Sequence, residues 1–179
     1  AVPGPACYRR GGPLTVTDCN VALGRVRPEL FPALFGPDGD QPIDRNAAMQ
    51  ALSALADEVA AAGGARPDEL ALAEGLLDIA NAHMAAAIRR ISIARGHDPA
   101  RHALVAFGGA GGQHGCAVAD ALGIGTILLH PLAGLLSALG IGLAELFSEG
   151  EQNDAVVTAR RSIARLDEAV RVETRNYVY

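Results

Sequence analysis

The sequence predicts an α/β fold, and three observations in the second half of the chain support this prediction. Two short apolar runs, 103–107 and 126–129, have the length and composition of buried strands. A glycine-rich turn at 108–112 follows the first run, and a helical stretch at 113–122 leads towards the second. Another helical stretch, rich in Ala, Leu and Gly, extends from 132 to Phe147. Strands that alternate with helices in this way form parallel sheets with both faces covered.

Two strands are too few for a stable sheet of this kind. We therefore expect another part of a longer protein, or another chain, to complete the sheet. The segment 151–179 is more polar, and we expect it to be a tail or the start of a following segment. Residues 1–150 are interpreted as one incomplete α/β domain.

The region before the first strand is predicted to contain two helices, and we interpret residues of about 40–100 as a helical insertion. Asp44 is a suitable N-cap for the first helix, which Gly63 ends, and Asp68 is suitable for a longer second helix, which Gly96 ends. On the longer helix the stripe predicted to face the core consists of Leu72, Leu76, Ile79, His83, Ala87 and Ile91.

The opening residues 1–39 are rich in Pro and Gly and are predicted to be mostly loop. Within this region, the alternation at 14–17 predicts a short strand, and 19–24 fits a single helical turn.

The charged residues exclude several kinds of chemistry. The net charge is −5, which argues against nucleic acid as a partner. All 15 basic residues are arginines, so a lysine Schiff base and a P-loop lysine are both excluded. The histidines His97, His102 and His130 are predicted to lie in loops, and their spacing does not indicate a metal site.

The cysteines and the apolar runs indicate a cytoplasmic protein. Cys7, Cys19 and Cys116 are widely spaced and form no CxxC pair, which argues against disulfides and structural zinc. The longest apolar run, 132–146, is too short to cross a membrane and is predicted to be a buried helix. We expect Cys7 and Cys116 to act as small hydrophobic residues rather than nucleophiles.

The glycine turn is the main candidate ligand site. Gly108, Gly109, Gly111 and Gly112 stand where a buried strand meets a helix N-terminus, so the backbone can approach a phosphate or a ribose. The alternative is a tight turn whose glycines serve packing alone.

Two common nucleotide motifs do not fit this turn. The dinucleotide fingerprint would require glycine where His114 stands, and no Walker A sequence is present. What remains, a strand followed by a Gly-Gly pair, is typical of adenosine contacts in the actin, sugar-kinase and chaperone ATPase fold.

Five polar residues are further candidates. Asp18 and Asn20 could hold a metal ion or a polar substrate group, although a turn and a helix cap would use them equally well. His114, in the first turn after the glycines, could hydrogen-bond to a nucleotide or a substrate, or could simply pack at the helix start. Asn81 and His83 lie on or beside the apolar stripe, where a core role is the more common one.

Four sequence blocks resemble the hydantoinase A/5-oxoprolinase family. The first, GPACYRRGGPLTVTDCNVALGR at 4–25, is similar to a family pattern that begins GPACYGRGGP and contains TDAN and LGR. IRRISIARGHDP at 88–99, FGGAGGQH at 107–114 and LLSALG at 135–140 follow in the family's order. The departures are small: Cys19 and Gly115 replace Ala, and Gly112 replaces Pro.

The resemblance implies an actin-like ATPase (ribonuclease H-like) subdomain, which is incomplete here and contains the helical insertion. It implies ATP and Mg²⁺ as cofactors and the opening of cyclic amides such as hydantoins or 5-oxoproline after phosphorylation. It also implies catalytic roles for Asp18 and His114, nucleotide contacts at the glycine turn, and substrate or metal contacts at Asn20 and Asn81. A hydantoinase B-type subunit or domain and the remainder of the A subunit are the implied partners, in a homo- or hetero-oligomer.

Two alternatives remain open at this point. A subunit of an acetone- or acetophenone-type carboxylase would carry the same four blocks. A non-catalytic nucleotide-binding or interaction domain is the other alternative, because the two phosphate motifs of the family, of the form DxGGTxxD, do not occur in the sequence. For the same reason we expect little activity from this chain alone.

Overall fold

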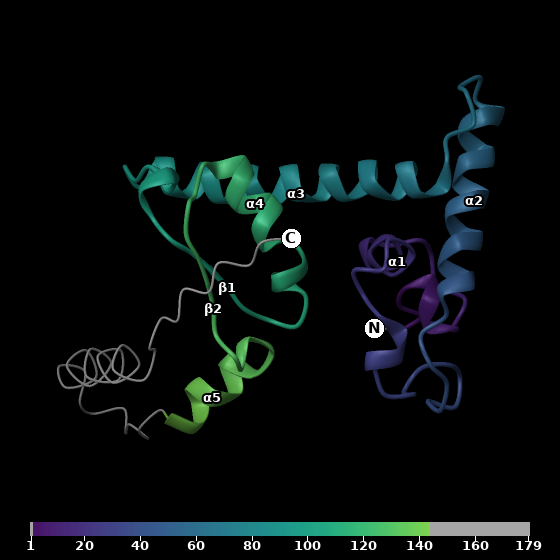
Figure 1. Cartoon of the computed structure of the whole chain (residues 1–179), viewed down its shortest axis with the longest axis horizontal. Coiled ribbons are helices and arrows are strands. Elements are labelled where there is room, and N and C mark those ends of the chain that lie inside the picture. Colours follow the sequence, from purple (N-terminus) through teal and green to yellow (C-terminus); the bar gives the residue numbers. More distant parts are fainter. Residues whose placement is uncertain (1, 144–179) are drawn as a thin grey trace. The chain divides into compact units, whose positions relative to one another are not determined.

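The computed structural model describes residues 2–143, which form two compact units (Figure 1). Along the chain, the first unit ends at His97 and the second begins at Asp98. The end of the helix predicted to reach Phe147 and the predicted tail at 151–179 lie outside the described residues.

The first unit is helical. It contains three α-helices, α1 (Val16–Ala22), α2 (Arg45–Ala61) and α3 (Glu69–Ala94), and two short 3-10 helices, η1 (Ala6–Tyr8) and η2 (Pro28–Leu30). No helix among the residues placed by the structure is long and apolar enough to span a membrane.

The predicted caps of the two long helices are confirmed. The Asp44 carboxylate accepts hydrogen bonds from the amides of Asn46 and Ala47 at the start of α2. The Asp68 carboxylate does the same for Leu70 and Ala71 at the start of α3. Both carboxylates satisfy amides that have no partner within their helix.

The strand predicted at 14–17 is wrong, because α1 already begins at Val16. Thr15 is the N-cap, and its amide and hydroxyl both donate to the Asp18 carboxylate, at 2.7 and 2.8 Å. This capping arrangement outweighs the strand preference of a four-residue alternating pattern. The helical turn predicted at 19–24 is the second half of the same helix.

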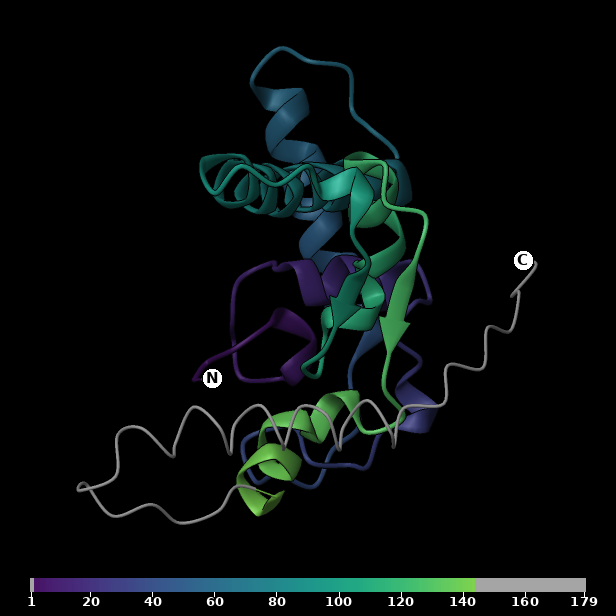
Figure 2. The same ribbon diagram turned by 90° about the vertical axis from the view of Figure 1, so that its left-hand side faces the viewer.

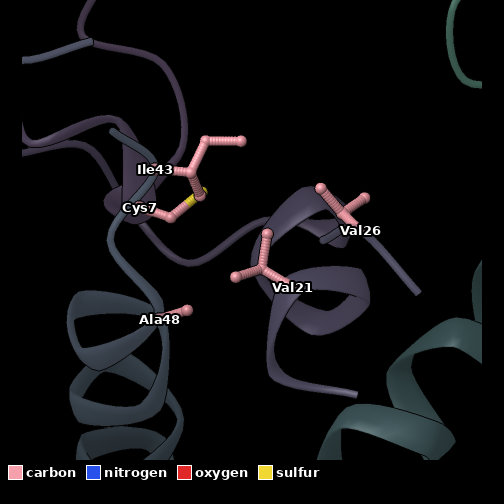
Figure 3. Close-up of a cluster of buried hydrophobic side chains, with 5 residues drawn as sticks. All are labelled: Cys7, Val21, Val26, Ile43 and Ala48. Carbon is pink, nitrogen blue, oxygen red and sulfur yellow. The ribbon is translucent and has the colours of Figure 1, made fainter. Parts of the chain in front are cut away.

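Two clusters of buried side chains hold the first unit together. Cys7, Val21, Val26, Ile43 and Ala48 form one cluster, which joins η1, α1 and α2 (Figure 3). Cys19, Ala22, Leu52, Ala73 and Leu77 form the other, between the three α-helices. The three α-helices and η1 therefore all contribute to the core.

The prediction of which face of α3 is buried is wrong. The buried positions are Ala73, Leu77, Asn81 and Ala85, whereas Ile79 and Ile91 are 56% and 53% exposed. Helix α3 packs mainly against α1 and α2. Small side chains at these buried positions let the neighbouring helices approach α3 closely, and this outweighs the greater hydrophobicity of the two isoleucines.

The second unit is the predicted α/β alternation. Strand β1 (Leu104–Ala106) pairs in parallel with β2 (Ile127–Leu129), and α4 (Gly115–Leu122) lies between them in the chain. The two strands run side by side in the same direction in Figure 2. The unit also contains η3 (Pro99–Arg101), η4 (Gly111–Gln113), η5 (Ala133–Leu135) and α5 (Leu136–Leu143).

Only one face of this small sheet is covered within the described part of the chain. Helix α4 contacts both strands and buries Val118, Ala119 and Leu122. Val105, in the middle of β1, is 53% exposed, so the described residues leave the second face to be covered by the other part or chain that the sequence led us to expect. Parallel strands with this composition normally have helices on both faces.

The apolar segment predicted to be a buried helix is exposed in its described part. Leu135 is 64% exposed and Ile141, in α5, is 77% exposed. The helix itself forms as predicted. Among the described residues, however, nothing buries its apolar side chains.

Candidate functional site

The glycine turn joins β1 to α4 and therefore lies at the carboxyl end of β1, at one edge of the parallel pair of strands. Gly108 has φ of 87°, a conformation that favours glycine, and its amide donates to the Ala133 carbonyl at 2.9 Å. This bond ties the turn to η5. The chain then passes through η4 and enters α4 at Gly115.

The other three glycines of the turn have neither a positive φ nor a crowded position. A Cβ atom added to Gly109 would meet nothing within 4 Å. At Gly111 and Gly112 its nearest neighbours would be 3.9 Å away, which is ordinary van der Waals contact. Packing within the described residues therefore does not explain why glycine occurs here, and the space beside the backbone is open to a ligand.

His114 is the N-cap residue of α4 and is buried, with 9% of its surface exposed. Its amide donates to the Gly111 carbonyl at 3.2 Å, and its carbonyl accepts from the Val118 amide at 3.0 Å. The histidine therefore connects the glycine turn to α4. Its predicted catalytic role stays a prediction.

Asp18 lies at the centre of the first unit and is fully buried. One carboxylate oxygen accepts from the Cys7 amide at 2.7 Å, and the other accepts from the Ala6 amide at 3.3 Å and from the amide and hydroxyl of Thr15. The carboxylate thus fastens η1 to the start of α1. This is the cap and turn role that the sequence left open, and a catalytic role for Asp18 stays a prediction.

The same carboxylate influences the neighbouring cysteines. Burial, and after it the hydrogen bond with Asp18, raises the pKa of the Cys7 thiol far above its ordinary value. Burial and the Asp18 charge also raise the pKa of Cys19. Both cysteines are therefore neutral, buried and unsuited to nucleophilic attack. Cys116 differs from the expectation, because it is exposed.

Asn20 and Asn81 are both buried, on α1 and α3 respectively. The side-chain oxygen of Asn20 has no hydrogen-bond partner among the described residues. Asn81 is 6% exposed and faces the core, as the more common alternative predicted.

The described residues do not fit a Mg²⁺ site. They contain no group of three or more His, Cys, Asp or Glu side chains that could hold a metal ion. Asp18, the carboxylate proposed from the sequence, already accepts hydrogen bonds on both oxygens. A magnesium ion that accompanies ATP would need other ligands.

The predicted site residues therefore fall into two groups. Asp18, Asn20 and Asn81 belong to the first unit, whereas His114 and the glycine turn at 108–112 belong to the second.

Sequence reasoning missed the bonding of the loop before α1. Arg9 has φ of 61° at a position where the family pattern has glycine. Its guanidinium pairs with Asp44 at 2.8 Å and donates to the Pro42 carbonyl at 2.9 Å. A side chain at Gly12 would collide with the carbonyl of Gly4. The arginine at position 9, where the family pattern has glycine, was the one feature of the sequence that could have indicated this bonding.

Comparison with known proteins places this chain in a family. The Hydantoinase/oxoprolinase family profile matches residues 1–150. The 5-oxoprolinase of Saccharomyces cerevisiae is 45% identical over 152 residues, which are 85% of this chain and 12% of that protein. The 5-oxoprolinase 1 of Arabidopsis thaliana is 41% identical over 174 residues, which are 93% of this chain and 14% of that protein.

Two solved structures are similar in fold to this chain. The ATP-dependent caprolactamase from Pseudomonas jessenii matches 99% of this chain and 27% of its own, with a TM-score of 0.63 and 30% identity. Acetone carboxylase matches 92% of this chain and 24% of its own, with a TM-score of 0.64. At 22% identity, this second likeness shows the fold alone.

The fold is therefore an α/β segment of a kind that also occurs in the ATP-dependent caprolactamase. The chain belongs to the hydantoinase/oxoprolinase family. It spans only 12–14% of the length of the two 5-oxoprolinases.

Proposed function

We propose that this chain is the part of an ATP-dependent cyclic amide hydrolase whose glycine turn contacts the adenosine side of ATP. The observation that carries the proposal is the turn itself. Gly109, Gly111 and Gly112 lie between a parallel strand and a helix, and neither backbone conformation nor crowding requires glycine there. Glycine is favoured where a ligand approaches the backbone closely.

The relatives support this choice of reaction. The similar proteins at 41–48% identity include four that are named 5-oxoprolinase, and the caprolactamase is described as ATP-dependent. In this class ATP would phosphorylate an amide oxygen and so convert a poor electrophile into a good one. The carboxylase alternative rests on a structural likeness at lower identity, and we favour the hydrolase.

We further propose an actin-like fold for the complete domain, with β1 and β2 as two strands of a larger sheet. The apolar Val105 on the uncovered face supports this, since such a strand is normally buried on both sides. The A-subunit remainder and a B-type subunit or domain are the proposed partners. The name of one relative, caprolactamase subunit alpha, describes that protein as part of an assembly.

The proposal gives roles to the glycine turn, His114, Asp18 and Asn20. The amides at 109–112 hydrogen-bond to polar groups of the nucleotide, and His114 holds the turn against α4 while its ring is placed beside the ligand. Asp18 keeps the loop before α1 in shape, as its four bonds support. Asn20 offers an acceptor that lacks a partner among the described residues.

Calorimetric titration with ATP tests the proposal. Gly109→Val places a side chain in the open space beside the turn, and we expect it to weaken ATP binding by at least about tenfold, because a close backbone approach is blocked. Gly125→Val is the matched control, since Gly125 also has no neighbour within 4 Å of an added Cβ. Equal ATP affinity in both variants would contradict the assignment. An ATP-binding protein without ATPase activity in its complete assembly would favour the non-catalytic alternative.

A further inference from the structure

His130 fixes the turn that connects β2 to η5. Its Nδ1 atom accepts a hydrogen bond from the Leu132 amide at 3.0 Å, and its carbonyl accepts one from the Ala133 amide at 2.8 Å. Residues 130–133 therefore form a β-turn, which we call the His130 turn, with Pro131 at the second position that proline favours. An asparagine or aspartate at the first position of such a turn accepts from the amide two residues on, and the imidazole of His130 does the same here.

The His130 turn is bonded to the first residue of the glycine turn. The Ala133 carbonyl accepts from the Gly108 amide at 2.9 Å, so it holds the residue whose φ of 87° directs the chain out of β1. Gly112, at the other end of the glycine turn, lies beside the end of β2, since a Cβ atom added to it would be 3.9 Å from a methyl group of Leu129. The chain from Leu129 to Ala133 therefore lies against both ends of the glycine turn.

Among these three hydrogen bonds, one depends on the type of side chain. The bonds at the carbonyls of His130 and Ala133 join backbone groups, which do not depend on the side chain. The bond from the Leu132 amide requires an acceptor on the side chain at position 130, and the histidine supplies it through Nδ1.

We propose, on the basis of the function proposed for the glycine turn, that His130 is a positioning residue for ATP binding. Its side chain fixes the His130 turn, the turn keeps the Ala133 carbonyl in place, and that carbonyl holds Gly108 and the amides at 109–112 in one conformation. A site that is held in its binding conformation before the ligand arrives binds more tightly, because less ordering accompanies binding. His130 acts through the backbone and needs no contact with the nucleotide.

Two substitutions at position 130 separate the acceptor from the other properties of the side chain. His130→Leu removes the acceptor, whereas His130→Asn keeps one, because an asparagine oxygen accepts from the amide two residues on. We expect His130→Leu to weaken ATP binding by about three- to tenfold in calorimetric titration, the range expected for one hydrogen bond. His130→Asn should bind ATP within about twofold of the wild-type chain.

Hydrogen exchange of single amides, measured by NMR without ATP, tests the link between His130 and the glycine turn. Exchange at Gly108 should become about three- to tenfold faster in His130→Leu and stay within about twofold of the wild type in His130→Asn. The Val118 amide, inside α4, should exchange at the wild-type rate in both variants, whereas a general loss of stability would accelerate both amides. Gln50→Leu, at an exposed position on α2, is the control and should change neither the ATP affinity nor the exchange rates.

The outcomes separate this role from the function proposed for the glycine turn. Weaker ATP binding in Gly109→Val together with unchanged binding in His130→Leu would overturn the role of His130 and leave the proposed function intact. An unchanged Gly108 exchange rate in His130→Leu, or a His130→Asn variant as weak as His130→Leu, would overturn it as well. Unchanged ATP binding in Gly109→Val would contradict the proposed function and, with it, the role of His130.

Discussion

Asp18 shows how a single residue can organise a loop that carries the most family-specific sequence of the chain. Its carboxylate gathers three backbone amides and one hydroxyl from two segments that are 11–12 and 3 residues away in sequence. A buried charge is tolerated here because hydrogen-bond donors replace the water that it has lost.

We expect Asp18→Asn to lower the free energy of unfolding by about 3 kcal/mol. An asparagine side chain has the same shape, but its NH₂ group would face amides that also donate, so at least one buried donor loses its acceptor. Urea denaturation of both proteins provides the measurement. Asp38→Asn is the control, because Asp38 is exposed and should change stability by less than about 0.5 kcal/mol. A similar, small effect of both substitutions would refute the structural role of Asp18.

The buried thiols predict how stability depends on pH. Burial raises the pKa of both Cys7 and Cys19, so the native state keeps these protons at a pH where the unfolded chain loses them. The contribution is fully present below the ordinary thiol pKa of about 8.5 and is lost as the pH rises above it.

Above that pH we expect the free energy of unfolding to fall by up to about 1.4 kcal/mol per pH unit for each buried thiol. Cys7→Ala removes one of the two thiols and should reduce this slope by about half, whatever its effect at neutral pH. Urea titrations at neutral pH and at several alkaline values give the slopes. A wild-type slope that Cys7→Ala leaves unchanged would show that this thiol ionises equally easily in both states.

At the scale of elements, local chemistry predicted most of the helices and both strands. The caps at Asp44 and Asp68 and the left-handed Gly123 at the end of α4 follow from neighbouring residues alone. The strand–turn–helix pattern is also a property of neighbouring residues, and it predicted the position of the glycine turn.

What the sequence could not predict depended on contacts between elements. The buried face of α3 is set by small residues that fit against α1 and α2. A prediction from hydrophobicity alone places larger apolar residues on the buried face and therefore chooses the wrong face. The short strand expected before α1 gave way to a cap that Thr15 and Asp18 form together. Likewise, no sequence pattern indicated that Asp18 would bind the amides of η1.

At the scale of the whole molecule, the described residues leave considerable apolar surface uncovered. Val105 of β1, Leu129 of β2 and Ile141 of α5 are between 53% and 77% exposed. The two strands have three residues each, and a pair of this size is rarely stable by itself. These surfaces suit the larger sheet that we propose.

The central claim is that the glycine turn contacts the adenosine side of ATP, and amide chemical shifts measure such a contact directly. In ¹H–¹⁵N spectra of the chain titrated with ATP, we predict the largest shifts at Gly109, Gly111 and Gly112, with little change at Gly125. Adenosine alone should shift the same amides. Binding of ATP that leaves these three amides unchanged, or that shifts only residues of the first unit, would contradict the claim.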